Sequence, residues 1–356
     1  MPEPALPTPL SGSARSIERA VARWLDESDA SDAVVVRTSG STGDPKDVLL
    51  SSRALQWSAT ASLHRLGGAG SWVLALPAHY VAGLQVIVRS VLAGVSPVVL
   101  AEHADLPAAA SRLPAGGRRY LAAVPTQLYR WMSAPADVEA LRSLDAVLVG
   151  GAAADGQLLA RAHSAAIKVV TTYGMSETCG GCVYDGVALD GVDVALAESG
   201  AIRLRGPMLF DGYAGEPELT ASTLHDGWLQ TADLGRFDAA GRLEVLGRQD
   251  DVVQSGGVSI SLTAVERRVA SMEAVAQCAV IAETDPEWGA RLVAYVVPRD
   301  HHRVPDLAST RDSVAEVLPR SWAPQEVVVL PRLPMLESGK IDRRSLRLRR
   351  ATSSAS

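Results

Sequence analysis

Short apolar runs alternate with amphipathic segments along the first half of the chain, and this alternation constrains the fold more than any other feature. The runs are rich in Val, Leu and Ala, as buried strands are, whereas the intervening segments carry apolar residues at helical spacing. Strands are expected at 32–38, 71–77, 118–125, 144–151 and 167–174, and helices at 16–25, 52–67, 125–132 and 155–165. Such alternation is typical of a largely parallel sheet with its ligand at the carboxyl ends of the strands. The sequence therefore predicts an α/β fold.

The pattern changes from about residue 199, where short strands and Gly/Asp turns replace the alternation, including a predicted hairpin at 235–248. A domain boundary is expected near the "GRQDD" stretch at 247–251. Beyond it, a helix, two strands and a further helix are predicted at 262–272, 275–283, 290–297 and 309–318, which is enough for a small α+β domain. We therefore expect two domains, at 1–249 and 250–356.

The composition excludes several classes of protein. The 356 residues are 47% hydrophobic and carry a net charge of −6, so a sizeable core is available but a basic stripe for nucleic acid is not. The locally basic stretch 343–350 is expected to be a solvated tail. The apolar segment 83–101 contains Arg89 and Pro97, which favours a buried helix and strand over a membrane span. The N-terminus has no pattern of a secretory signal, so we expect a cytoplasmic protein without membrane insertion.

The cysteines permit two interpretations. Three cysteines suit a reducing compartment, and Cys179 and Cys182 have the CxxC spacing of a redox or zinc pair. A structural zinc ion needs four ligands, and no second CxxC or CxH pattern accompanies this one. We therefore expect small cysteine side chains that fill a tightly packed site.

The stretch "TSGSTGDPK" at 38–46 combines hydroxyl residues, glycines and a lysine directly after a predicted strand. Glycines let backbone amides approach a phosphate, hydroxyl groups donate hydrogen bonds, and lysine supplies a positive charge, so the stretch favours an anion site. It is not a Walker A loop, because Pro45 precedes Lys46 and Asp47 follows it. A flexible polar turn is the alternative interpretation.

Four more glycine-punctuated stretches follow in order: "TTYGMSE", "GWLQTADLG", "GRQDDVVQSGG" and "LPMLESGKIDR". Together with the loop at 38–46, this set resembles the acyl-adenylate-forming superfamily of AMP-dependent synthetases and ligases, from about residue 34 to residue 346. The resemblance implies a large N-terminal domain with mostly parallel sheets flanked by helices. It also implies a small, mobile α+β C-terminal domain that rotates about a hinge at Asp250.

The resemblance implies a nucleotide site built from the loop and four later stretches. The loop would hold the β- and γ-phosphates of ATP, "GGAA" would line the adenine pocket, and Tyr173 would pack on the base. Asp233 would bind the ribose hydroxyls, and Arg248 would contact the ribose or a phosphate. The residues implied as nucleotide ligands are Thr38, Ser39, Gly40, Ser41, Thr42, Gly43, Lys46, Gly150, Gly151, Ala152, Tyr173, Gly174, Ser176, Asp233 and Arg248.

The resemblance also implies the catalytic groups and the acid-binding site. Glu177 would hold Mg²⁺, for which a carboxylate oxygen is a suitable ligand, and Lys340 of the C-terminal domain would act on the reacting carboxylate. The remaining implied residues are His79, Thr126, Gly180 and Gly181 in the substrate pocket and Gly256 and Gly257 in a channel for coenzyme A. Taken singly, each charged residue is equally well a turn cap or a solvated charge, and His79 equally well a structural histidine.

Two features depart from the superfamily pattern. Asp47 stands where glycine usually follows the loop lysine, and we expect its charge to point away from the phosphates. The stretch ahead of the loop is also shorter than in most relatives, so part of the usual N-terminal subdomain is expected to be missing. A homodimer is one arrangement that would cover the core exposed there.

The shortened form and the stretch "YGMSETCGGCVYDGVALDGV" resemble the o-succinylbenzoate-CoA ligase family of menaquinone biosynthesis. This resemblance implies ATP-dependent ligation of 2-succinylbenzoate to coenzyme A through an acyl-adenylate, with release of AMP and pyrophosphate. Three alternatives remain at this point: another aryl- or acyl-CoA ligase, a stand-alone adenylation domain that loads a carrier protein, and a non-catalytic nucleotide-binding protein. The joint presence of Glu177, Asp233, Arg248 and Lys340 argues against the last of these.

Overall fold

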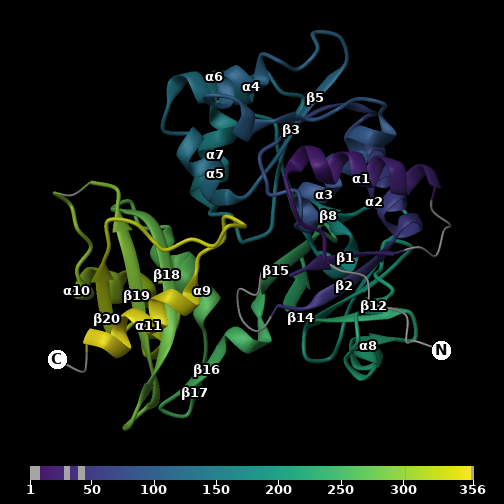
Figure 1. Ribbon diagram of the computed structural model, residues 1–356. Coiled ribbons are helices and arrows are strands. Elements are labelled where there is room, and N and C mark those ends of the chain that lie inside the picture. The colour runs from purple at the N-terminus through teal and green to yellow at the C-terminus, as the bar shows by residue number, and fades with distance from the viewer. Residues whose placement is uncertain (1–8, 28–32, 39–44, 301, 354–356) are drawn as a thin grey trace.

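The structure is a computed structural model that describes residues 9–27, 33–38, 45–300 and 302–353. Figure 1 shows a larger unit built from the N-terminal and central parts of the chain and a smaller unit, green to yellow, built from the C-terminal part. The chain passes from one to the other directly after β15 (Leu243–Arg248).

The larger unit is centred on a seven-stranded sheet of order β4-β3-β5-β6-β7-β8-β9. The strands β4, β3, β5, β6 and β7 run parallel, whereas β8 and β9 are antiparallel additions at one edge. The predicted parallel sheet is therefore confirmed. Its strands are β3 (Gly70–Leu74), β4 (Val98–Val99), β5 (Arg118–Ala123), β6 (Ala146–Val149), β7 (Val169–Met175), β8 (Gly180–Tyr184) and β9 (Val187–Ala188).

Helices cover both faces of this sheet, because successive side chains of a buried strand point to opposite sides. In β3, Trp72 packs into one core cluster and Val73 into another. The first cluster lies against α1 (Ala14–Glu27), α2 (Ser52–Arg65) and α3 (Val81–Leu92). The second lies against α4 (Leu106–Ala110), α5 (Pro125–Trp131), α6 (Pro135–Arg142) and α7 (Gly156–Ser164). Both clusters are therefore internal, as the near-continuous apolar strands require.

A three-stranded antiparallel sheet, β1-β2-β12, carries the predicted phosphate loop. It consists of β1 (Ala33–Arg37), β2 (Asp47–Ser51) and β12 (Gly212–Tyr213). The prediction of β1 is confirmed, but β2 was not predicted, because five residues between a polar loop and a helix give too short a pattern. The stretch 38–46 therefore connects the two strands of a hairpin, in which Arg37 pairs with Asp47.

A five-stranded sheet completes the larger unit and includes the predicted hairpin at 235–248. Its long strand β14 pairs with β11, β13 and β15, so the segment that contains Asp233 is held on both sides. The elements of this region are β10 (Asp193–Leu196), β11 (Ala201–Arg205), α8 (Pro217–Thr223), β13 (Leu224–His225), β14 (Trp228–Phe237) and β15.

The smaller unit has its own core, centred on the sheet β18-β19-β20. The predicted helices and strands at 262–318 are all present. The elements are the short 3-10 helix η3 (Gln249–Asp251), β16 (Val252–Ser255), β17 (Val258–Ser261), α9 (Leu262–Ala270), β18 (Val275–Asp285), β19 (Gly289–Pro298), α10 (Leu307–Ala315), β20 (Glu326–Val329) and α11 (Arg343–Ser353).

The prediction of a solvated tail at 343–350 was wrong. The stretch begins α11, Leu346 is fully buried in the core cluster against β18 and β19, and Arg343 forms an ion pair of 2.8 Å with Glu266 of α9. One of its two leucines, Leu346, is buried while Leu348 is exposed, so the charge count concealed a packed helix.

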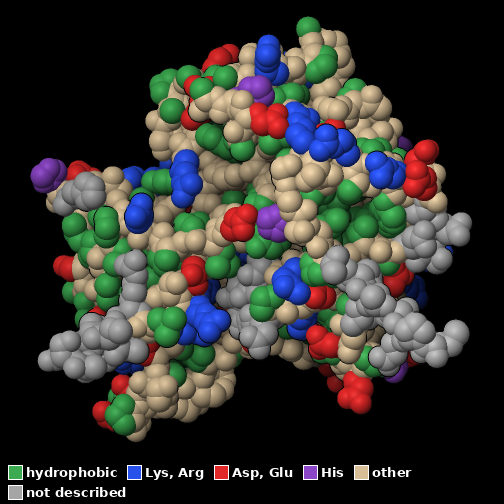
Figure 2. Space-filling view, viewed as in Figure 1, with side chains coloured by type: hydrophobic (Ala, Val, Ile, Leu, Met, Phe, Trp, Pro, Cys, Tyr) green, Lys and Arg blue, Asp and Glu red, His purple; other side chains and the backbone are tan. Residues whose placement is uncertain are grey.

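Side chains of opposite charge are mixed over the surface. On the face drawn in Figure 2, Lys and Arg side chains of the described residues are interspersed with Asp and Glu. Among the helices that the structure describes, none is both long enough and apolar enough to cross a membrane.

Candidate active site

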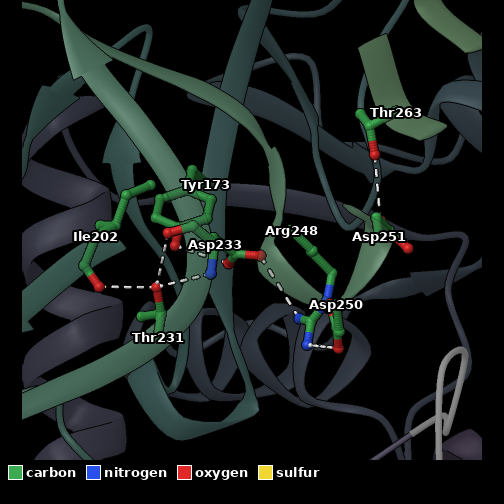
Figure 3. Close-up of polar contacts among 8 residues, drawn as sticks. All are labelled: Tyr173, Ile202, Thr231, Asp233, Arg248, Asp250, Asp251 and Thr263. Atoms are coloured by element: carbon green, nitrogen blue, oxygen red, sulfur yellow. Dashed lines mark hydrogen bonds and ion pairs between the residues drawn. The ribbon is translucent and has the colours of Figure 1, made fainter. Parts of the chain in front are cut away.

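Asp233 lies at the centre of a hydrogen-bond network between the two large sheets (Figure 3). The hydroxyl of Tyr173, at the end of β7, donates a hydrogen bond of 2.8 Å to Asp233 Oδ2. The Asp233 amide donates to Thr231 Oγ1 at 3.1 Å, and Thr231 in turn donates to the carbonyl of Ile202 at 2.8 Å. Burial raises the pKa of Asp233, whereas the Tyr173 hydrogen bond and the Arg248 charge lower it. Predicted base and ribose contacts therefore lie together.

Arg248 connects this carboxylate to the start of the smaller unit. Its Nη1 lies 3.5 Å from Asp233 Oδ1, and its Nε and Nη2 donate hydrogen bonds of 2.7 and 2.8 Å to the two carboxylate oxygens of Asp250. These bonds lower the pKa of Asp250. Asp251 accepts a hydrogen bond of 3.1 Å from Thr263 of α9 (Figure 3). The predicted hinge residue therefore lies in direct contact with a predicted nucleotide ligand.

Lys340 reaches the site from the smaller unit. Thr126 of α5 donates a hydrogen bond of 2.9 Å to the carbonyl of Gly339, so the "SGK" turn is docked on the larger unit. Gly339 has φ +78°, and a Cβ there would lie 2.8 Å from Val124 Cγ2, so glycine is required. A Cβ built on Gly151 would lie 3.7 Å from Lys340 Cε, which places the lysine over the predicted adenine segment.

Lys340 is half-buried and not fully exposed to solvent. Burial lowers the pKa of Lys340 and Arg248 lowers it further, whereas Asp233 and Glu177 raise it. Four charged residues from separate stretches of the sequence therefore share one electrostatic environment.

Glu177 lies in the 3-10 helix η2 (Ser176–Thr178), directly after β7. The hydroxyl of Tyr213 in β12 donates a hydrogen bond of 2.8 Å to Glu177 Oε1, and Lys46 Nζ lies 5.0 Å from the centre of the Tyr213 ring. Tyr213 was not predicted as a site residue, because the "DGYAG" stretch indicates only a turn. Tyr213 links the predicted magnesium ligand to the predicted phosphate loop.

Two hydrogen bonds join the ends of the predicted phosphate loop. The amide of Thr38 donates to the Lys46 carbonyl and the amide of Lys46 donates to Thr38 Oγ1, both at 2.8 Å. The predicted ligands Ser39, Gly40, Ser41, Thr42 and Gly43 lie outside the described residues. Asp47 is bound by Arg37 through two hydrogen bonds of 2.8 Å. Its extra negative charge is therefore paired at the base of the loop.

Gly180 of β8, a predicted residue of the substrate pocket, packs against α3. Gly180 has φ +97°, and a Cβ there would lie 3.4 Å from Gln85 Cγ. Gly174 packs so closely on the Gly180 carbonyl that any side chain would collide. His79 Nε2 lies 3.9 Å from Glu337 Oε1, next to the "SGK" turn. Thr126, by contrast, is engaged with the Gly339 carbonyl, so the structure places it at the domain contact.

α3 carries two buried polar residues that were not assigned from the sequence. Gln85 and Arg89 lie four residues apart, about one helical turn, and both are buried. Only 3% of Arg89 is exposed, its guanidinium stacks on the Trp72 ring at 4.9 Å, and its Nε has no hydrogen-bond partner among the described residues. None of the ion pairs found in the described part of the chain includes Arg89. A buried arginine inside an apolar helix was the available sequence signal.

One pair of predicted residues stands apart from this arrangement. Gly256 and Gly257 form the turn between β16 and β17, with φ +56° and +77°. The Gly256 amide donates to the Trp288 carbonyl at 2.9 Å, within the smaller unit. Gly150 belongs with the site, since a Cβ there would lie 2.1 Å from Thr172 Oγ1, while Ala152 is exposed and Ser176 half-buried. The two turn glycines make no such contact with the site.

The donor set fits a magnesium ion shared with a nucleotide. Mg²⁺ is commonly held by one or two carboxylates, water and substrate phosphates, so a full cage of protein ligands is not expected. Glu177 offers one half-buried carboxylate, and the residues described include no group of three or more His, Cys, Asp or Glu side chains arranged for a metal. Cys179 and Cys182 are free and buried, in agreement with their predicted packing role.

Comparison with known proteins gives consistent matches. A probable 2-succinylbenzoate–CoA ligase of Mycobacterium tuberculosis is 44% identical over 321 residues, which cover 88% of this chain and 83% of that protein. The structure of o-succinylbenzoate CoA synthetase from Bacillus subtilis in complex with the acyl-adenylate intermediate OSB-AMP has a TM-score of 0.74 at 27% identity, over 88% of this chain and 68% of that chain. The same synthetase with ATP and magnesium ion has a TM-score of 0.72 at 27% identity, over 88% and 69%.

Family models match both units. The AMP-binding enzyme model matches residues 7–214, and the AMP-binding enzyme C-terminal domain model matches residues 264–340. Since the first model covers more than half of the sequence and the mycobacterial relative is 44% identical, the chain belongs to the AMP-binding enzyme family.

Proposed function

We propose that this protein joins 2-succinylbenzoate to coenzyme A at the expense of ATP, with release of AMP and pyrophosphate, in menaquinone biosynthesis. The observation that carries the proposal is the convergence of Lys340 with Gly151, Glu177, Asp233 and Arg248, since Lys340 comes from the other unit and packing alone does not require it there. The names of the mycobacterial relative and the Bacillus synthetase support the choice of acid. Ligation of another aryl acid and loading of a carrier protein remain the alternatives to be tested.

We propose the nucleotide site that the family resemblance implies, and the contacts described above support it. Thr38, Lys46 and the loop between them hold the β- and γ-phosphates. Gly150, Gly151 and Ala152 line the adenine pocket beside Tyr173, and Asp233 accepts hydrogen bonds from the ribose hydroxyls. A magnesium ion bound by Glu177 supplies positive charge to the phosphates. Arg248 adds a positive charge beside Asp233, the carboxylate proposed to bind the ribose.

In the first half-reaction a carboxylate oxygen of the acid forms a bond to the α-phosphorus of ATP, and the bond to the pyrophosphate oxygen breaks. The two reactants are both anions, so the protein must offset their repulsion and hold them in line. Lys340 does this, because its ammonium group lies over Gly151 in the docked orientation of the smaller unit. No proton transfer is needed, because the acid is already ionised at neutral pH.

In the second half-reaction the thiol of coenzyme A gives up its proton to solvent and its sulfur bonds to the acyl carbon, while the bond between that carbon and the phosphate oxygen breaks and AMP departs with the bonding electrons. We propose that the domains 1–249 and 250–356 rotate relative to each other about Asp250. The rotation withdraws Lys340 and brings the Gly256–Gly257 turn to the channel through which the thiol enters. Glycines with positive φ allow backbone approach without a side chain in the channel.

Arg89 supports an acid with a second negative charge. Gln85 Cγ lies 3.4 Å from the Cβ position of Gly180, and one helical turn further along α3 Arg89 carries a buried guanidinium without a carboxylate partner among the described residues. An unpaired buried cation is costly in the free protein, so a bound anion is the natural compensation. 2-Succinylbenzoate carries two carboxylates, one for adenylation and one for this end of the pocket.

A panel of acids assayed by ATP–pyrophosphate exchange tests the proposal. We expect 2-succinylbenzoate to support exchange much faster than benzoate or medium-chain fatty acids, because only the dianion satisfies both ends of the pocket. Thioester formation with coenzyme A, followed by mass, separates a CoA ligase from an enzyme that loads a carrier protein. Equal exchange with benzoate would refute the assignment of the acid.

Arg89→Met is expected to lower kcat/KM for 2-succinylbenzoate by about 10- to 100-fold, the usual value of a hydrogen bond to a charged group in a buried site. The kcat/KM for benzoate should change little, since benzoate has no second carboxylate. The melting temperature should be equal or higher, because methionine replaces arginine with a side chain of similar length and removes a buried unpaired charge. A similar loss with both acids would place Arg89 outside substrate recognition.

A further inference from the structure

Tyr213 occupies a place between two groups that the proposed function assigns to the phosphates and the metal. It belongs to β12 and is only 5% exposed. Its hydroxyl donates a hydrogen bond of 2.8 Å to Glu177 Oε1, while the face of its ring lies 5.0 Å from Lys46 Nζ. One side chain therefore contacts the carboxylate through its polar end and the loop lysine through its ring.

The backbone around Tyr213 is joined to both partners. The amide of Phe210 donates to the Glu177 carbonyl at 3.0 Å, and the amide of Ala214 donates to the Asp47 carbonyl, one residue after Lys46, at 2.8 Å. The Tyr213 amide donates to Thr220 Oγ1 at 2.8 Å. These bonds fix the ring relative to η2 on one side and to the end of the phosphate loop on the other.

The chemistry of each contact is suited to positioning. A phenol that donates to one carboxylate oxygen limits rotation of Glu177 and leaves Oε2 available to a cation. The ring face attracts the ammonium group of Lys46 by a cation–π interaction, which limits the positions that this flexible side chain adopts.

We infer that Tyr213 is a positioning residue that holds Glu177 and Lys46 in a fixed relation, so that the metal ligand and the phosphate cation meet the same nucleotide together. The inference rests on the proposed function, because it takes Glu177 as the magnesium ligand and Lys46 as a phosphate contact. It adds a separable role for each end of one side chain: the hydroxyl acts through the metal, and the ring acts through the phosphate.

Calorimetric titration of the full chain with ATP, in the absence of acid and coenzyme A, tests the two roles. Binding is measured in EDTA and at rising MgCl₂. Tyr213→Phe keeps the ring, so its ATP affinity in EDTA should match wild type. The Mg²⁺ concentration that gives half of the Mg²⁺-dependent increase in ATP affinity should rise about 10-fold, because the variant loses a group that orients a metal ligand. Tyr213→Leu should show the same Mg²⁺ shift and also weaken ATP binding in EDTA by about 2- to 5-fold.

Tyr120→Phe is the matched control. Tyr120 is a fully buried tyrosine whose hydroxyl donates to the carbonyls of Leu66 and Gly68, away from the site, so both affinities should stay at the wild-type value. A Tyr213→Phe variant with wild-type Mg²⁺ dependence overturns the inference, as does one that weakens ATP equally with and without Mg²⁺. If the ATP affinity of the wild-type protein did not depend on Mg²⁺, the proposed metal role of Glu177 would be refuted, and the inference with it.

Discussion

Lys340→Ala is expected to slow formation of the acyl-adenylate by about 100- to 1000-fold, the usual effect of removing one preorganised charge from a developing anion. Thioester formation from a supplied acyl-adenylate should change little, because the lysine serves only the docked orientation. The physical basis is the position of Lys340, half-buried over Gly151 in a turn held by Thr126. The slower adenylation requires no change in the position of any other residue of the smaller unit.

The two half-reactions are measured separately, by pyrophosphate release and by single-turnover conversion of purified acyl-adenylate. Lys168→Ala is the control, since Lys168 is an exposed lysine whose nearest carboxylate is Asp145 at 3.8 Å. The melting temperature of both variants should stay close to wild type, because neither substitution opens a cavity in the core. If Lys340→Ala slowed both half-reactions alike at unchanged stability, the proposal of two domain orientations would be lost.

Asp250→Pro is expected to spare adenylation to within a few-fold and to reduce thioester formation by at least about 100-fold. Proline fixes φ near −65°, so the chain at the boundary between the units loses the freedom that a domain rotation needs. The structure places Asp250 in η3, directly between β15 and β16.

Asp250→Ala separates the backbone from the side chain. It removes both hydrogen bonds to Arg248 but leaves φ free, so it should retain most of the thioester-forming activity. Rapid-quench measurement of the two steps in each variant provides the comparison. An alanine variant as impaired as the proline variant would show that the Arg248 ion pair matters and that backbone rotation at this position does not.

The candidate site was largely accessible to sequence reasoning because its chemistry is concentrated in short stretches. A hydroxyl- and glycine-rich loop, an isolated glutamate after a strand and an "SGK" turn each require particular residue types at fixed local spacing. Tyr213 and Arg89 were not accessible in the same way. In the sequence, Tyr213 is a single tyrosine in a turn and Arg89 is a polar interruption of an apolar helix. Only tertiary packing brings Tyr213 beside Glu177 and Arg89 over the ring of Trp72.

The sequence by itself determined the alternation of strands and helices, the parallel sheet and the residue types available for nucleotide chemistry. All of these depend on local periodicity or on neighbours within a few residues. The tertiary structure alone decided that the stretch 38–46 joins two antiparallel strands, that the basic C-terminal stretch is a packed helix, and that Arg248 spans Asp233 and Asp250. Those outcomes depend on contacts between distant segments, which form only because burial of both sheets brings the segments together, and no local pattern encodes such contacts.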